Sequence, residues 1–201
     1  TWYVVTKSKN IKVAWVSCTE VDNGFSDKKN QILHCSREID ILQSTIAEAK
    51  SKSDFVIVTP HWGAEYQAQA ALVQEKMAKK MIAAGADLIL GAHPHTVQNW
   101  KSYTSPVSGK SVPVVFSLGN FVSNQSDSKP QRDTMKRTSV AATVSLIRGN
   151  DGKVVIKSMG FIPLYMKRPS LELVAFDPKD VTEGASYSAS LEYLEGRLGR
   201  E

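Results

Sequence analysis

Apolar residues in the first half of the chain follow two different periods. Two apolar runs rich in Val, Ile and Trp, over residues 2–6 and 11–18, predict a hairpin or two strand ends. Two further apolar runs, over residues 54–60 and 86–92, predict strands, the first nearly continuous as in a strand covered on both faces. Apolar residues spaced three and four apart predict amphipathic helices over 36–52 and 69–84, the first with Ser36 as its N-cap and the second ended by Gly85. The pattern therefore predicts an α/β fold, with parallel strands at its centre and helices on the faces of mixed sheets.

The second half of the chain has a different pattern. It predicts a loop over residues 96–113, a buried strand over 114–118 and a polar mobile segment over 123–137. After these it predicts a two-stranded hairpin over 138–148 and 153–164, a further strand over 171–176 and a terminal helix over 188–198. The hairpin is indicated by alternating residues on either side of a Gly-Asn-Asp-Gly turn. We expect residues 1–201 to form a single domain, with a core over 10–125 and the hairpin and terminal helix over 138–201.

Composition narrows the class of protein. A chain of 201 residues can bury one substantial core, and its 42% apolar and 22% charged residues are ordinary for a globular domain. It contains no run of 18 apolar residues, so no membrane-spanning helix is predicted. The net charge of +5 comes from scattered Lys and Arg, a distribution that does not indicate a nucleic-acid partner.

The two cysteines leave two alternatives open. Cys18 and Cys35 flank a polar loop, and a disulfide closing that loop would require an oxidising compartment. Two unpaired thiols are the other interpretation, because sequence alone does not give the distance between them. His34, beside Cys35, is interpreted as a surface residue.

Three of the four histidines follow predicted strands. His61 comes after the run over 54–60, and His93 and His95 come after the run over 86–92. If these strands are parallel neighbours, their carboxyl ends open at the same edge of the sheet, where α/β folds place their sites. A neutral imidazole binds zinc, manganese or iron. One such histidine alone is more often a packed side chain, but the three together predict a metal site.

Other residues near the histidines are candidates for further roles. Glu65 is the nearest carboxylate in sequence and a candidate catalytic residue; it could equally ligate the metal, orient a histidine or lie at a helix N-terminus. Asn120 follows the strand over 114–118 and is predicted to bind substrate or to support the site. Trp62 and Gln98 are further candidates for substrate contact, although packing explains Trp62 equally well.

These segments together resemble one known family. The residues that carry the resemblance are His61-Trp62-Gly63-Ala64-Glu65-Tyr66, Ala84-Gly85-Ala86-Asp87, Gly91-Ala92-His93-Pro94-His95-Thr96-Val97-Gln98 and Ser117-Leu118-Gly119-Asn120-Phe121-Val122. In this order they are similar to the bacterial CapA-type capsule-synthesis family, the poly-gamma-glutamate biosynthesis proteins, whose fold is that of calcineurin-like metallophosphoesterases. The resemblance covers roughly residues 10–125 well and is weak beyond them.

The resemblance implies a four-layer α/β sandwich with two divalent ions, of Mn, Zn or Fe. His61 and His93 would bind mainly one ion, and His95 the other. The superfamily's aspartate motif and Asn-His motif do not occur in the sequence, so the ligand set is incomplete in this chain. The chain is therefore expected to be the C-terminal part of the domain, with the other half encoded upstream or present as a separate chain. Such proteins are extracytoplasmic, at the cell surface or tethered to the membrane by a segment not found in this sequence.

Three functional hypotheses follow. The leading one is metal-dependent hydrolysis of a phosphoester or an anionic surface polymer, with water activated by the ions as the nucleophile. The alternative is a non-catalytic accessory module for capsule polymer synthesis or export, in which the metal site is vestigial and the net positive charge favours an anionic partner. The third is a structural fragment whose function belongs to the other half of the domain.

Overall fold

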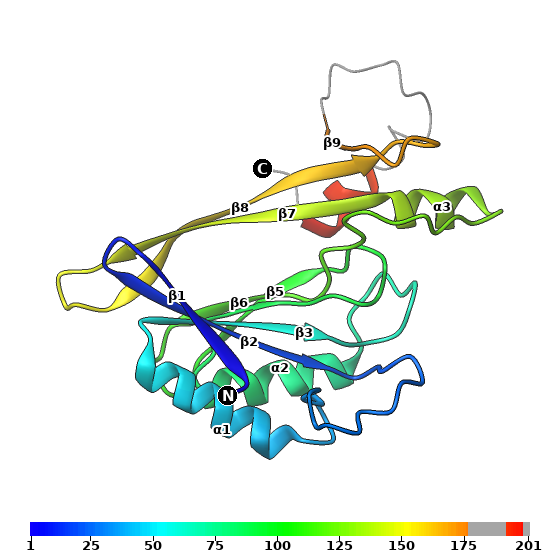
Figure 1. The fold of residues 1–201 in the computed structure, drawn as a ribbon. Coiled ribbons are helices and arrows are strands. Elements are labelled where there is room, and N and C mark those ends of the chain that lie inside the picture. Colours follow the sequence, from blue (N-terminus) through cyan, green and yellow to red (C-terminus); the bar gives the residue numbers. More distant parts are fainter. Residues whose placement is uncertain (177–191, 199–201) are drawn as a thin grey trace.

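The computed structural model describes residues 1–176 and 192–198 and contains two sheets (Figure 1). The first sheet has six strands in the order β1-β2-β3-β4-β6-β5. Their bounds are β1 Tyr3–Ser8, β2 Ile11–Thr19, β3 Phe55–His61, β4 Leu88–Leu90, β5 Trp100–Thr104 and β6 Ser111–Val115. Strands β2, β3, β4 and β6 are parallel, and the outer pairs β1–β2 and β5–β6 are antiparallel. The predicted parallel centre is confirmed, and the carboxyl ends of four strands lie at one edge of the sheet.

Two helices cover one face of the first sheet (Figure 1). They are α1 (Ile39–Lys52) and α2 (Leu72–Ala84), close to the predicted ranges. Ile46 of α1 and Met81 of α2 are fully buried, and they belong to one core cluster with Val16, Val56 and Val58 of the sheet. Burying a side chain of this size contributes about 1.5 to 3 kcal/mol, so this interface stabilises the strands that lead to the site.

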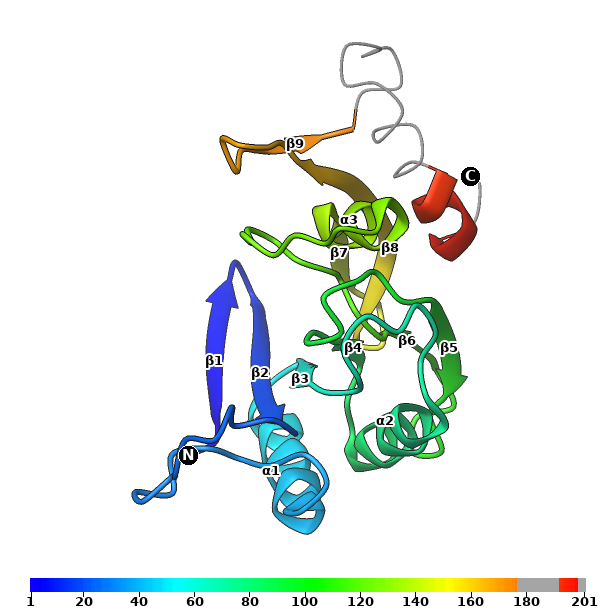
Figure 2. The same cartoon turned by 90° about the vertical axis from the view of Figure 1, so that its right-hand side faces the viewer.

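The second sheet is an antiparallel meander on the opposite side of the first (Figures 1 and 2). It consists of β7 Thr138–Arg148, β8 Val154–Met166 and β9 Leu173–Ala175, which confirms the predicted hairpin. Phe55, Ile57 and Leu88 of the first sheet form a second core cluster with Val154, against which Ile156 packs. The described residues thus form three layers, helices, sheet and sheet, where the family resemblance implies four.

Two segments differ from the prediction. Residues 96–113, expected to be a loop, contain β5 and the start of β6; β5 is an exposed edge strand, so it lacks the apolar pattern that marks a buried one. Residues 123–137, expected to be mobile, include the helix α3 (Pro130–Arg137). This helix has no apolar stripe and is held instead by ion pairs, among them Arg137–Asp133 and Lys136–Asp127.

Smaller corrections concern the start of α1. The helix begins at Ile39, and the hydroxyl of Ser36 donates to the Glu20 carboxylate at 2.8 Å instead of capping the helix. His34 is 9% exposed, so its interpretation as a surface residue is wrong. Cys18 and Cys35 form a disulfide that joins β2 to the segment before α1, which decides between the two alternatives.

The predicted terminal helix is described only in part. Residues 192–198 are helical, and Leu194 is buried against Val97 and Val140; residues 188–191 lie outside the described residues. No helix in the described part of the chain is long and apolar enough to cross a membrane.

Candidate metal centre

Backbone hydrogen bonds join the segments that follow β3 and β4 at the edge of the sheet. The amide of Ala92 donates to the Pro60 carbonyl at 2.9 Å, and the amide of Trp62 donates back to the Ala92 carbonyl at 3.0 Å. Further along, the amide of Tyr66 donates to the Pro94 carbonyl at 2.7 Å. These bonds hold the loop after His61 against the loop that contains His93 and His95, so the imidazoles from two strand ends are forced close together.

Several residues of these loops have a left-handed backbone. Tyr66, His93 and His95 have φ of 61°, 97° and 58°, in a region that side chains with a Cβ rarely adopt. Such conformations cost about 1 to 3 kcal/mol each and persist only where the surrounding contacts enforce them. The hydrogen bonds between the two loops supply these contacts. They fix the backbone at His93 and His95, and with it the direction in which each side chain leaves the loop.

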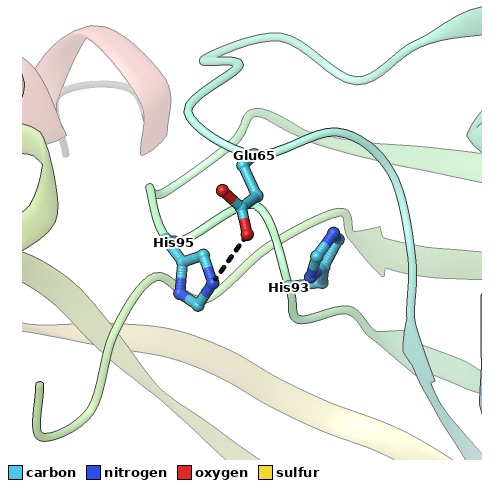
Figure 3. Close-up of side chains that lie close together, drawn as sticks. All are labelled: Glu65, His93 and His95. Atoms are coloured by element: carbon cyan, nitrogen blue, oxygen red, sulfur yellow. Dashed lines mark ion pairs between the residues drawn. The ribbon is translucent and has the colours of Figure 1, made fainter. Parts of the chain in front are cut away.

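The four candidate side chains form one cluster. The ring centroids of His61 and His93 are 4.6 Å apart, and those of His93 and His95 are 5.7 Å apart. Ligand atoms of Glu65, His93 and His95 all lie within 4.8 Å of one another, and these three side chains point toward a common space (Figure 3). The predicted convergence of three histidines is confirmed, and Glu65 joins them. His61 lies beside the ring of His93, outside this compact group of three.

Hydrogen bonding assigns the tautomer of His95. The side-chain amide of Asn120 donates to the Lys136 carbonyl at 3.1 Å, and a carbonyl can only accept. The Asn120 Oδ1 atom therefore faces His95 Nδ1, at 2.8 Å, and must accept its proton. In the neutral ring, His95 Nε2 then carries the lone pair, and it lies 3.7 Å from Glu65 Oε1. Two acceptors facing each other across this gap leave room for a cation between them.

His61 and His93 are held in the neutral form. The pKa of His61 is lowered from 6.5 first by desolvation and then by charge on His93 and His95. The pKa of His93 is lowered by desolvation and by His95, with a smaller opposing effect of Glu65. At neutral pH both rings therefore keep a lone pair for metal binding, which a protonated imidazole does not offer.

The donor set fits one divalent ion. Imidazole nitrogens and a carboxylate oxygen are ligands of Zn, Mn and Fe. Ligand atoms around a four-coordinate ion lie about 3.4 Å apart, so small side-chain rotations would close the observed group of three. Among the residues that the structure describes, Glu65, His93 and His95 are the one group of three such side chains close enough to share an ion.

Trp62 and Gln98, predicted to contact substrate, are both buried. Trp62 is fully buried, and its indole donates to the Phe116 carbonyl at 2.9 Å. Gln98 is also fully buried, donates to the Gln67 carbonyl at 2.9 Å and accepts from Gln74 at 3.1 Å. Neither offers a surface to a substrate, so both support the loops of the site, in contrast to the expectation from sequence.

Sequence reasoning missed one part of the site. Lys136 of α3 is 6% exposed, and its ammonium lies 4.2 Å from the centre of the Tyr66 ring and 3.1 Å from Asp127 Oδ2. Gln125 accepts from the Asn120 amide at 3.3 Å. These residues belong to the polar segment expected to be mobile, and no motif marks them, because their contribution depends on where α3 is placed.

Comparison with known proteins gives the family. Residues 1–125 match the model of the bacterial capsule synthesis protein PGA_cap, which is more than half of the chain. The chain belongs to this family. This confirms the resemblance seen in the sequence.

Two named relatives are similar over different lengths. The PGA biosynthesis protein CapA of Bacillus subtilis (strain 168) is 36% identical over 120 residues, covering 59% of this chain and 30% of the relative. The capsule biosynthesis protein CapA of Bacillus anthracis is 31% identical over 187 residues, covering 86% of this chain and 41% of the relative. The chain therefore spans less than half of the length of these relatives.

Two solved structures are partly similar to this chain. A novel phosphatase from Mycoplasma pneumoniae is 12% identical with a TM-score of 0.46, over 94% of this chain and 62% of that one. The sulfate thiohydrolase SoxB from Thermus thermophilus is 12% identical with a TM-score of 0.47, over 98% of this chain and 28% of that one.

Proposed function

We propose that this capsule-family domain binds a divalent metal ion and takes part in hydrolysis of a phosphoester or of an anionic surface polymer. The observation that carries the proposal is the convergence of Glu65, His93 and the lone pair of His95 Nε2 at the sheet edge. Glu65 is half exposed, which leaves one side of the group open to solvent and to a substrate. Three protein ligands and an open side are the features of a catalytic rather than a structural metal site.

The residues of this chain would divide the work as follows. His93, His95 and Glu65 would hold the ion, so Glu65, predicted as catalytic, would act as a ligand. Asn120 would orient His95. A divalent ion held there supplies Lewis acidity, which polarises a phosphoryl or carbonyl oxygen and makes water more acidic. His61, neutral and beside His93, would contribute to a second ion together with ligands from outside this chain.

The metal identity, a second ion and the partners are part of the same proposal. We expect Mn, Zn or Fe, because imidazole and carboxylate together suit these ions. The upstream half of the domain, in the same protein or as a separate chain, would complete a two-ion site. An extracytoplasmic location, at the cell surface or tethered through a segment outside this chain, is supported by the Cys18–Cys35 disulfide, since disulfides persist in oxidising compartments.

Hydrolysis of a chromogenic phosphodiester by the full-length protein tests the proposal. We expect metal-dependent turnover that is abolished by a chelator and falls at least 100-fold in His93→Ala. Lys129→Met, an exposed substitution on the segment before α3, should leave turnover unchanged. A protein that binds no metal, or whose turnover is unaffected by His93→Ala, would overturn the proposal. Polymer binding that survives chelation, without turnover, would indicate the accessory module instead.

A further inference from the structure

The helix α3 belongs to the second half of the chain, yet it contacts the metal centre. It leads directly into β7, and its carboxyl end lies beside the loops at the edge of the first sheet (Figure 1). The last carbonyls of a helix have no partner within the helix. One of them, the Lys136 carbonyl, accepts the hydrogen bond from the Asn120 amide at 3.1 Å. The end of α3 thus decides which atom of Asn120 faces His95.

The side chain of Lys136 fixes the position of that helix end. Its ammonium is buried and donates to Asp127 Oδ2 at 3.1 Å and to the Ser126 carbonyl at 3.3 Å. The same ammonium lies over the Tyr66 ring, 4.2 Å from its centre, and Tyr66 follows Glu65 directly. A cation on the face of an aromatic ring contributes most where it is shielded from water; the Lys136 side chain is buried and the Tyr66 ring is partly buried. Lys136 therefore joins α3 to the loop that presents Glu65.

The opposite side of α3 is attached to the second sheet. The Arg137 guanidinium lies 4.6 Å from the centre of the Tyr165 ring and donates to the Met166 carbonyl at 3.0 Å. Arg137 also pairs with Asp133, and Arg168 pairs with Asp133 at 3.3 Å. The helix is thus attached both to the second sheet, through Arg137, and to the loops at the edge of the first sheet, through Lys136.

We infer that Lys136 is a positioning residue for the metal centre: it holds α3 so that the Lys136 carbonyl orients Asn120, and Asn120 keeps His95 in the Nδ1–H tautomer with Nε2 directed at the ion. The expected effect on metal affinity rests on the proposed metal site. The effect on the tautomer of His95 does not require a bound ion. Groups that orient a metal-binding histidine in this way typically affect metal affinity 10- to 100-fold, as an order of magnitude.

The test reads the tautomer of His95 by long-range ¹H–¹⁵N NMR of the metal-free 201-residue chain, and Co²⁺ affinity by titration. We expect Nδ1–H in the wild type. In Lys136→Met we expect an Nε2–H population at His95 and a Co²⁺ affinity about 10-fold lower. Asp127→Asn keeps the shape of the Lys136–Asp127 pair but removes the negative charge. The His95 tautomer and the Co²⁺ affinity should therefore change in the same direction as in Lys136→Met, but by less. Lys129→Met is the matched control and should change neither.

The possible outcomes separate this inference from the proposed function. If Lys136→Met does not fold, Asp127→Asn decides the question. A lower melting temperature with an unchanged His95 tautomer and unchanged Co²⁺ affinity in these variants would overturn the inference, because Lys136 would then only stabilise the fold. An Nε2–H tautomer in the wild type would overturn it as well. If His95 is Nδ1–H in the wild type and shifts toward Nε2–H in the variants, but the wild type binds no Co²⁺, the proposed function is overturned and the positioning role is supported.

Discussion

Single residues at the centre have conformations that are costly outside this context. His93 has φ of 97°, and the ring of His95 is held by one hydrogen bond to Asn120 at 2.8 Å. The cost of the left-handed backbone is offset by the hydrogen bonds that join the two loops, such as Tyr66 to Pro94. The side chains are thus oriented before any ion binds, which reduces the reorganisation that metal binding requires.

Glu65 gives the first prediction at this scale. Glu65→Gln replaces a charged ligand with a neutral amide of the same size, so we expect the affinity for Zn²⁺ or Co²⁺ to fall at least 10-fold in a titration. Glu75→Gln is the matched control, since Glu75 pairs with Lys101 and belongs to α2. Equal affinities for the two variants would show that Glu65 does not ligate the ion.

The lowered pKa values of His61 and His93 predict how stability depends on pH. Between the unfolded pKa of 6.5 and the lower folded pKa, the unfolded chain binds more protons than the folded chain. The stability of the metal-free protein should therefore fall as the pH falls from 7 through about 6.5. Denaturant titrations at several pH values measure this, and His93→Asn should show a shallower dependence. Stability that rises over this interval would contradict the lowered pKa values.

At the residue scale, the sequence was informative where local pattern determines position. His61, His93 and His95 follow strands, and parallel strands end at the same edge, so their convergence could be predicted. Burial of Trp62 and Gln98 could not, because it depends on how α2 and β6 pack around them. Lys136 could not be predicted for the same reason: its partners Tyr66 and Asn120 are distant in sequence.

Secondary-structure elements are fastened to one another at a few points. The Cys18–Cys35 disulfide joins the end of β2 to the segment before α1, across a sequence separation of 17. Gly91, directly after β4, lets the backbone pack closely against Phe116 and Trp62. A Cβ at Gly91 would lie 2.1 Å from the Phe116 carbonyl oxygen and 2.5 Å from Trp62 Nε1. Both points support the strands whose ends carry the histidines.

Removing the disulfide should destabilise the fold without removing the metal ligands. For a loop of this size the cross-link is worth about 3 kcal/mol, mainly by restricting the unfolded chain. We expect that loss in the double variant Cys18→Ser/Cys35→Ser, measured by denaturant unfolding, and a similar loss on reduction of the wild type. A double variant as stable as the oxidised wild type would contradict the disulfide.

Gly91→Ala tests the close packing between β4 and β6. The added methyl group overlaps backbone and indole atoms that have little freedom to move, so we expect a loss of about 2 to 3 kcal/mol. Gly196→Ala is the matched control, because a Cβ at Gly196 meets nothing within 4 Å. A Gly91→Ala protein with unchanged unfolding free energy would show that Trp62 and Phe116 are less closely packed than described.

Elements differed in how well the sequence predicted them. The buried strands β2 and β3 and the helices α1 and α2 have strong apolar periodicity, because each faces a core, and they were predicted within a few residues. The edge strand β5 and the helix α3 lack this signal. β5 is formed by its pairing with β6, and α3 is held by paired charges. Neither interaction leaves the apolar periodicity from which strands and helices were predicted.

At the scale of the whole molecule, the two sheets meet at the candidate centre. The amide of Val140 in β7 donates to the Leu118 carbonyl at 3.0 Å, and Gly119 forms a bridge with Ser139. A Cβ at Gly119 would lie 2.7 Å from the Thr138 carbonyl oxygen, so glycine permits this approach. The second sheet therefore supports the residue that orients His95, and the centre depends on both halves of the chain.

Anomalous diffraction from crystals of this chain grown with Zn²⁺ tests the account most directly. We predict a zinc peak bounded by the Glu65 carboxylate, His93 and Nε2 of His95, with Asn120 still bonded to Nδ1 of His95. The same peak should be absent in crystals of His93→Ala. A fully occupied zinc ion elsewhere in the molecule, with none at this group, would contradict the account.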